Sequence, residues 1–416
     1  MTTVMLNRHV LRWAAGAGGQ YLPGPPSHRS LVTRTFGGGL DGFDPSAFPD
    51  VVVCDMLDPA RLEAVVAWVA TTRSAGHIVA LHEKDLLLAA RVRAVLGLPG
   101  PTEAETLPFR DKITMKDRLV AAGYTALPRY LPLSAFTSVD ELPWRGTRLV
   151  VKARRGLGAS EVRVLPWSNS AVAAAVTDLR LSPADGEIEE FIEGPMYHCD
   201  SVVEDGRIIF VSASRYLRNP GSFGTSDHLG TVTLRPTDPP RAELLEHNAA
   251  VIAGLGLQNG VTHIEFFGND ERGLVFCEAA ARPGGGGIDE CVQRTTGVNL
   301  VRAAVRLQAG DGALESPPKS AVDTVCGVIG LLSDEYPPEL ENELRRRVPG
   351  LVSYAATPAA LPGGIRHATD YRHRVVISAA SQEEFEEQRR TTLSAHQELS
   401  GRSRNNDAKW CGRSGS

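Results

Sequence analysis

Cysteines are few in this chain of 416 residues, and their spacing suggests neither a zinc site nor a disulfide framework. No C-x-x-C pair occurs among the six. They stand at Cys54, Cys199, Cys277, Cys291, Cys326 and Cys411. Scattered cysteines of this kind are typical of a reducing compartment, so we expect a cytoplasmic protein.

Long apolar runs and excess positive charge are also absent. No apolar run approaches the roughly 18 residues of a membrane span, and the N-terminus lacks the apolar core and cleavage site of a signal peptide. With 44 basic and 49 acidic residues the net charge is −5, so no basic field would hold a nucleic acid. We therefore expect neither a membrane nor a nucleic-acid partner. Hydrophobic residues at 42% and charged residues at 22% indicate a globular chain of two to three domains.

The first hundred residues alternate strand and helix patterns. Short apolar runs at Val51–Val53 and Ile78–Leu81 predict buried parallel strands, and helices are expected after Asp58 and over Asp85–Leu96. This order indicates a doubly wound α/β layer. The glycine clusters Gly16–Gly19 and Gly37–Gly39 form no dinucleotide fingerprint, which argues against an NAD-dependent dehydrogenase.

The rest of the chain reads as α+β. A strand and its return are expected at Leu149–Val151 and Glu161–Leu165, a further strand at Glu187–Ile192, and then two long hairpins up to Phe276. Strand patterns near the C-terminus suggest a small closing α+β domain, and the polar tail after Ser400 suggests disorder. The boundaries that we expect are 1–107, 108–186, 187–315, 316–400 and a disordered 401–416.

Lys152 ends an apolar strand and precedes a glycine-containing loop that reaches Ser160. Glycines at Gly156 and Gly158 would let backbone N–H groups approach phosphate oxygens closely. The alternative is an exposed hairpin with a lysine at its edge.

An acidic pair is expected on neighbouring strands. Alternation places His263 and Glu265 on one face of their strand, and Leu274, Phe276 and Glu278 on one face of the next. If the strands pair antiparallel, Glu265 and Glu278 converge, and two carboxylates there suit Mg²⁺. The alternative is two solvated edge glutamates.

Two further segments each allow a functional and a purely structural interpretation. Arg282, before Gly284 and Gly285, could clamp a carboxylate or an acyl phosphate against bare backbone, or be part of a turn. The run from Glu189 to Ile192 could dock adenine on its backbone, or be a strand end.

These pieces, in this order, resemble the ATP-grasp superfamily and, within it, the carboxylate–amine ligases. The likeness runs from about Leu81 to Gly310. The segments that carry it are Arg110-Asp111-Lys112, Val150-Val151-Lys152, Gly156–Ser160, Glu189–Ile192, Gly194–Asp200, His263–Phe267, and Cys277-Glu278 with Arg282–Gly285.

The resemblance implies an α/β and α+β multidomain protein. A doubly wound layer would come first, followed by an ATP-grasp fold of two α+β lobes. The small lobe would carry a phosphate lid and the large lobe the metal site, and a small C-terminal α+β extension would follow.

The implied ATP-binding residues are Lys112, Lys152, Gly156, Gly158, Ser160, Glu189, Glu190, Phe191, Ile192 and His198. The implied metal ligands are Glu265 and Glu278, the catalytic residues Arg282 and Lys152, and the substrate-binding residues Arg282, Gly284, Gly285 and Arg215. A polar strand face would explain His198 and Asp200 nearly as well. Lys116 would be helical scaffolding.

The implied reaction uses ATP and Mg²⁺. A carboxylate is phosphorylated to an acyl phosphate, and an amine then displaces phosphate to form an amide or dipeptide bond. Where many members carry an asparagine metal ligand this chain has Ala280, which puts a second metal in doubt. Amino acids are the expected substrates, with a carrier-protein thiol as an alternative acceptor and a non-catalytic ATP-binding regulator as the other alternative. Dimers are common in the family, but the sequence shows no independent sign of one.

Overall fold

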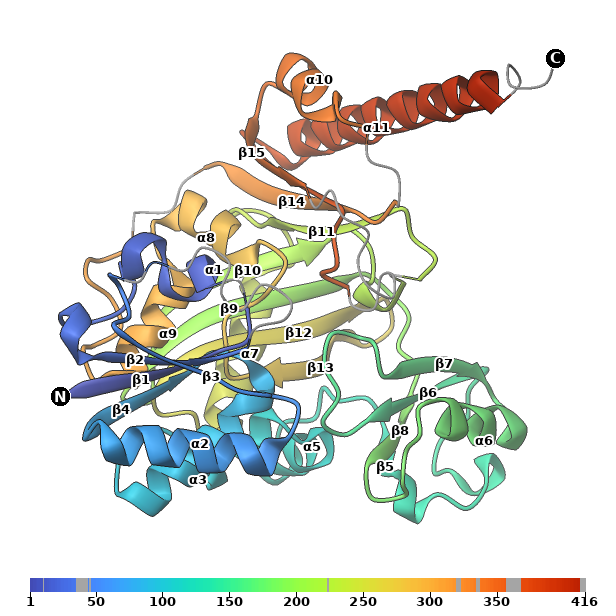
Figure 1. Ribbon diagram of the computed structural model, residues 1–416. Helices are drawn as coiled ribbons and strands as arrows, with labels where there is room; N and C mark the ends of the chain where they lie inside the picture. The colour runs from blue at the N-terminus through green and yellow to red at the C-terminus, as the bar shows by residue number, and fades with distance from the viewer. Residues whose placement is uncertain are drawn as a thin grey trace.

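Three sheets organise the chain in a computed structural model (Figure 1). The structure describes residues 1–9, 11–34, 44, 46–222, 224–318, 323–333, 337–356 and 368–411, the last eleven by backbone alone. Gly37–Gly39 lies outside the described residues.

The N-terminal sheet is parallel, which confirms the doubly wound α/β layer. Its strands are β1 (Thr2–Asn7), β2 (Arg29–Thr33), β3 (Asp50–Val53) and β4 (Ala75–Ala80), in the order β3-β2-β1-β4. Its helices are α1 (Leu11–Ala15), α2 (Pro59–Thr72) and α3 (Leu86–Leu96). The predicted start and stop signals act as expected. The carboxylate of Asp58 caps α2, and Gly97, at φ 65°, closes α3. Strands β1 and β2 were missing from the sequence analysis.

The second sheet is small and antiparallel. After α4 (Glu103–Thr106) and α5 (Lys112–Ala121) come β5 (Tyr130–Pro132), β6 (Arg148–Ala153), β7 (Val162–Pro166), α6 (Asn169–Asp178) and β8 (Gly186–Glu190). Strand β8 lies between β5 and β6 in the order β5-β8-β6-β7. The boundary that we expected between residues 186 and 187 is therefore wrong, because it cuts β8 away from the sheet to which it is hydrogen-bonded.

The third sheet has eight strands, in the order β13-β12-β9-β10-β11-β14-β16-β15. Its strands are β9 (Met196–Glu204), β10 (Arg207–Tyr216), β11 (His228–Thr233), β12 (Gly260–Asn269), β13 (Gly273–Ala280), β14 (Val325–Leu331), β15 (Leu351–Ala356) and β16 (His373–Ala379). The C-terminal strands β14, β15 and β16 thus extend the sheet of the large lobe instead of forming a sheet of their own.

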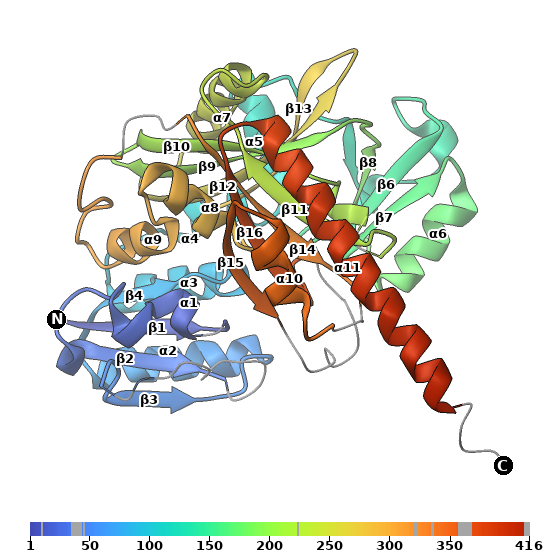
Figure 2. The same cartoon turned by 90° about the horizontal axis from the view of Figure 1, so that it is seen from above.

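Helices pack against this large sheet and between it and the N-terminal layer (Figures 1 and 2). They are α7 (Arg241–Leu255), α8 (Ile288–Thr296), α9 (Leu300–Gln308), α10 (Leu340–Arg347) and α11 (Gln382–Cys411). Helix α11 crosses the C-terminal strands and continues past Ser400, so the expected disordered tail is helical as far as Cys411. Across the described ranges, no helix is both long enough and apolar enough for a bilayer crossing.

Candidate functional site

A cavity of about 1560 Å³ opens between the three sheets. Single small-molecule sites usually hold about 300–1,000 Å³, so this cavity has room for a nucleotide and further substrates. Most of the predicted site residues line it: Lys112, Lys152, Gly156, Gly158, Glu189, Glu190, Phe191, Ile192, Glu265, Glu278, Arg282 and Gly285. Segments far apart in the sequence therefore meet at one site.

The acidic pair is formed by the hairpin of β12 and β13. Glu265 lies opposite Glu278 in the antiparallel register, as predicted. The register then shifts, so that Phe266 pairs with Phe276 and Cys277 is an extra residue, a β-bulge. The bulge corrects the predicted alternation: Phe276 packs in the core while Cys277 and Glu278 face the cavity. Two facing carboxylates offer the hard oxygen ligands that Mg²⁺ prefers.

Lys112, at the start of α5, joins the acidic pair to the glycine loop. Its Nζ lies 3.0 Å from Oε2 of Glu278 and donates to the carbonyl of Gly156 at 3.1 Å. Burial would lower the pKa of Lys112, but the charges of Glu278, Glu83 and Glu187 together outweigh it, and the pKa is raised. Lys112 is therefore a buried cation beside the acidic pair.

Lys152 belongs to a second buried charge cluster. Its Nζ lies 2.7 Å from Oε2 of Glu189 on β8 and 3.6 Å from Oε1 of Glu187. Lys116, fully buried, pairs with the same two glutamates and lies over the ring of Tyr130. Burial opposes the charged form of Lys152, yet the two carboxylates raise its pKa. Sequence analysis missed Glu187, because a lone glutamate in a strand carries no motif.

The glycine loop between β6 and β7 approaches the cavity with bare backbone. Gly158 has φ 64° and Ala159 has φ 59°, both in the left-handed region. The hydroxyl of Ser160 donates to the carbonyl of Leu157 at 3.0 Å, and Ser160 is not among the residues that line the cavity. In this conformation the hydroxyl braces the loop, so the predicted contact of Ser160 with phosphate has no support here.

The predicted adenine segment, at the end of β8, also lines the cavity. The backbone N–H of Glu190 donates to the carbonyl of Arg129, and its carboxylate pairs with Arg272 at 2.9 Å. The ring of Phe191 stacks on the guanidinium of Arg148, 3.8 Å away. The backbone N–H and the carboxylate of Glu190 are therefore both engaged within the protein.

Arg282 is held by a glutamate that sequence analysis missed. Its Nη2 lies 2.9 Å from Oε2 of Glu83, and Arg110 pairs with the other oxygen of that carboxylate. Burial would lower the pKa of Arg282, but Glu83 raises it. Its position could have been inferred from the sequence, because Glu83 comes shortly after strand β4 and residues that follow parallel strands gather at one edge of the sheet.

Three further predicted contacts lack support, as the Ser160 contact does. His198 is fully buried, bonds to Asp200 and Thr231, and does not line the cavity, so its predicted contact with a nucleotide has no support from this geometry. Arg215 lies on the opposite face of β10 from Tyr216, pairs with Glu386 of α11 at 3.0 Å and is not among the residues that line the cavity. Gly284 does not line the cavity either.

Gly284 instead packs against a buried polar network. A Cβ on Gly284 would lie 2.9 Å from Oδ1 of Asp200 and 3.0 Å from Nδ1 of His263. Asp200 bonds to Nδ1 of both His198 and His263, at 2.7 Å and 2.9 Å. Nε2 of His263 lies 3.4 Å from Oε1 of Glu265.

This network holds Glu265, the first carboxylate of the acidic pair. Burial would raise the pKa of Glu265, but the hydrogen bond from His263 and the further bond from Tyr216 lower it to about 2. Burial would lower the pKa of His263, and Asp200 outweighs it, which raises the pKa to about 9. His198, Asp200 and His263 also have ligand atoms within 4.8 Å of one another. Their mutual hydrogen bonds already satisfy these atoms, so Glu265 and Glu278 remain the better candidates for Mg²⁺.

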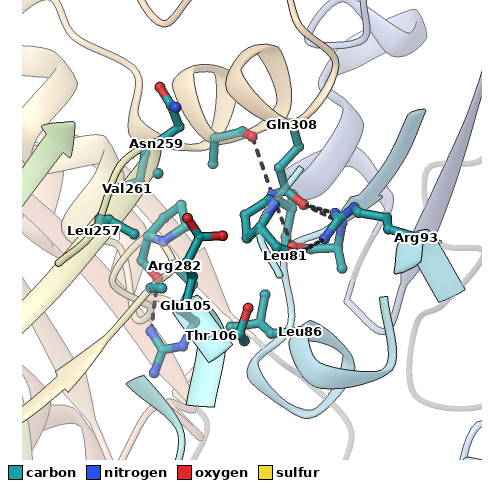
Figure 3. A pocket seen from close by; sticks show the side chains of 16 residues that line it. Leu81, Leu86, Arg93, Glu105, Thr106, Leu257, Asn259, Val261, Arg282 and Gln308 are labelled. Atoms are coloured by element: carbon teal, nitrogen blue, oxygen red, sulfur yellow. Dashed lines mark hydrogen bonds between the residues drawn. The ribbon is translucent and has the colours of Figure 1, made fainter. Parts of the chain in front are cut away.

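A second, small pocket of about 40 Å³ lies behind Arg282 (Figure 3). Leu81, Leu257 and Gln308 line it, and Arg93 contacts Gln308 at its edge. Its volume is close to that of one or two water molecules, so it cannot hold a nucleotide.

Comparison with known proteins agrees with this geometry. No family model matches the chain. An L-arginine-specific L-amino acid ligase of Bacillus subtilis is 25% identical over 294 residues, which cover 68% of each chain. The solved L-amino acid ligase of Bacillus licheniformis has a TM-score of 0.74 at 17% identity, covering 95% of this chain and 98% of that one.

A third relative was solved with a nucleotide. The N5-carboxyaminoimidazole synthetase of Staphylococcus aureus, complexed with ADP, has a TM-score of 0.68 at 14% identity and covers 94% of this chain and 96% of that one. The chain therefore shares the fold of these solved ligases and synthetases, and its sequence is similar to that of an L-amino acid ligase.

Proposed function

We propose that this ligase activates an amino-acid carboxylate with ATP and joins it to the amine of a second amino acid, forming a dipeptide. The single observation that carries the proposal is the convergence of Lys112, Lys152, Glu265, Glu278 and Arg282 on one large cavity. The names of two relatives, both L-amino acid ligases, support amino acids as the substrate class.

Phosphate binding is assigned to the two buried lysines. Lys112 now contacts Glu278, and Lys152 contacts Glu189. When ATP binds, each lysine would turn part of its hydrogen bonding toward phosphate oxygens. Gly156 and Gly158 would close over the same oxygens as a lid, which keeps water from the acyl phosphate.

Metal binding is assigned to the acidic pair. Glu265 and Glu278 would hold Mg²⁺, which neutralises charge on the phosphates. Ala280, at the end of β13, is buried and apolar. We therefore propose that the side chains of this hairpin supply two carboxylate ligands, and that water or substrate completes the coordination.

Arg282 would hold the activated carboxylate. Its planar guanidinium, already oriented by Glu83, can spread the charge that develops on the phosphorylated oxygen. Gly285 leaves the backbone beside it open. The amine then attacks the acyl carbon and phosphate leaves, so the chain itself needs no covalent intermediate.

Compartment and assembly remain predictions. The five described cysteines are all free, which fits a cytoplasmic enzyme. A homodimer is expected only from the resemblance to the superfamily.

A matrix of acid and amine pairs tests the function. We expect ADP release and a product of the summed mass less water for at least one amino-acid pair, detected by mass spectrometry. The control is Lys152→Ala, which should give neither. ATP binding without ADP release from any pair would instead indicate a regulatory protein, and ADP release that requires a carrier protein would indicate the alternative acceptor.

A further inference from the structure

The edge of the N-terminal sheet at β4 is held by a side chain from α9. Strand β4 is the last in the order β3-β2-β1-β4, so β1 is its one neighbouring strand in that sheet. Gln308, the last residue of α9, bonds to Ala80, the last residue of β4. Its Oε1 accepts from the backbone N–H of Ala80 at 3.0 Å, and its Nε2 donates to the carbonyl of Ala80 at 3.1 Å. One glutamine thus makes the pair of hydrogen bonds that a further strand would offer.

Arg93 of α3 strengthens the same edge. Its Nη2 donates to Oε1 of Gln308 at 2.9 Å and to the carbonyl of Ile78 at 2.6 Å (Figure 3). Arg93 is buried, so water competes little for these hydrogen bonds. We call Gln308 and Arg93 together the β4 clamp, because they fix the end of β4 to α3 and α9.

The carboxylate that holds Arg282 comes three residues after the clamped Ala80. Glu83 is buried and accepts from Nε and Nη2 of Arg282, both at 2.9 Å. Among the residues that the structure describes, this guanidinium otherwise donates to the carbonyl of Pro283. The place of Arg282 in the large cavity therefore depends on where β4 ends.

The small pocket of about 40 Å³ lies at this junction. Ala80 and Gln308 line it, and so do Arg282 and Pro283. Side chains do not fill this space, so close packing alone does not fix Arg282 relative to β4. The hydrogen bonds of the β4 clamp and of Glu83 supply that link.

We propose that Gln308 is a positioning residue for the reaction: it holds the end of β4 so that Glu83 keeps Arg282 in place. The inference rests on the proposed function, in which Arg282 holds the activated carboxylate. A displacement of about 1 Å in a substrate-holding group can lower a rate by ~10²-fold. Lys152 lies on β6 of another sheet, so ATP binding does not depend on the clamp.

Steady-state kinetics of Gln308→Met test this role, because methionine keeps the length of the side chain and loses its hydrogen bonds. We expect kcat/KM for the amino acid to fall by roughly ten-fold or more, with the KM for ATP unchanged. The matched control is Asn248→Leu, which removes the buried hydrogen bond of 2.9 Å from Asn248 to Ser201, between α7 and β9. The control should lower the midpoint of urea unfolding and leave both kinetic constants unchanged.

A double-mutant cycle asks whether the effect passes through Glu83. Glu83→Gln alone should lower kcat/KM, and adding Gln308→Met should then change it little, because residues that act through one another are not additive. If Gln308→Met does not fold, Gln308→Glu takes its place, since it keeps the acceptor for Ala80 and Arg93 and loses the donor.

Hydrogen exchange measured by mass spectrometry gives a readout that needs no turnover. Gln308→Met should speed exchange in the peptides that cover 78–85 and 279–284, and Asn248→Leu should not. The proposal is overturned if kcat/KM stays at the wild-type value, if the KM for ATP rises in parallel, if the two effects in the cycle multiply, or if exchange near Arg282 is unchanged. Failure of the proposed function would show separately, as absent ADP release from wild type, and the exchange measurement would still decide whether Gln308 holds Arg282 in place.

Discussion

Glu265 and Glu278 face each other across the β12–β13 ladder, while each is paired on its outer side with a cation. His263 contacts the first carboxylate and Lys112 the second. Two carboxylates therefore lie together in a buried cavity without unbalanced repulsion. This arrangement leads to four predictions.

Removing one cation or one metal ligand from the cavity should stop the first half-reaction. We expect Lys152→Ala and Glu278→Ala each to reduce ADP formation by at least ~10²–10³-fold, the size seen when one stabilising group at a transition state is lost. Both variants should keep the far-UV circular dichroism of the wild type. Glu271→Ala, in the exposed turn of the same hairpin, is the control. Wild-type rates in both variants would remove the site assignment.

Lys116 should matter for stability because it is fully buried between Glu187 and Glu189. We expect Lys116→Met to lower the free energy of unfolding by about 3–5 kcal/mol, since it leaves buried carboxylate charge uncompensated. Urea denaturation at pH 7 measures this. The double variant Lys116→Met/Glu187→Leu should recover much of the loss, because Lys152 still pairs with Glu189.

The exposed pair of Arg73 and Asp50, 2.7 Å apart, provides the contrast to that buried cluster. Arg73→Met should cost no more than about 1 kcal/mol. If Lys116→Met and Arg73→Met lower the free energy of unfolding by the same amount, burial does not make the Lys116 cluster more important for stability than an exposed ion pair.

His263 should tune the metal site through Glu265. We expect His263→Gln to weaken Mg²⁺ binding by about 10–100-fold, the usual effect of removing a group that orients a metal ligand. The KM for Mg²⁺ and direct titration of the metal in the presence of ADP both measure this. A change in kcat with unchanged metal affinity would contradict the positioning role.

The same histidine predicts a pH dependence of stability. Its pKa is about 9 in the folded protein and about 6.5 in the unfolded chain. A raised pKa stabilises the fold fully below pH 6.5, and this contribution disappears as pH rises toward 9. The metal-free protein should therefore lose stability between pH 6.5 and 9, and His263→Gln should flatten that part of the curve. Thermal melts in matched buffers test this, and equal slopes in the two proteins would count against it.

Much of the candidate site could be predicted because its motifs are local. Lys152 at a strand end and Glu265 opposite Glu278 follow from strand periodicity and turn signals, and the structure shows both. Asp58 and Gly97 likewise fixed helix ends through contacts within a few residues.

The errors arose where partners come from distant segments. Alternation put Phe276 and Glu278 on one face, but the bulge at Cys277 separates them. Arg215 looked like a substrate arginine until Glu386, 171 residues away, proved to be its partner. Strand β8 pairs with β5 and β6 because of hydrogen bonds that no local pattern specifies.

The order of strands, helices, glycines and charged residues thus determined the fold class and the candidate site segments, because each of those signals acts over a few neighbouring residues. Only the tertiary structure decided which carboxylate each cation meets. Glu83 meets Arg110 and Arg282, 27 and 199 residues away along the chain; Glu187 meets Lys116, 71 residues away; and Asp200 meets His263, 63 residues away. A buried carboxylate is costly unless a cation is paired with it, so these pairings matter for stability. Which carboxylates are buried depends on how whole sheets pack together, and no local pattern in the sequence reports that packing.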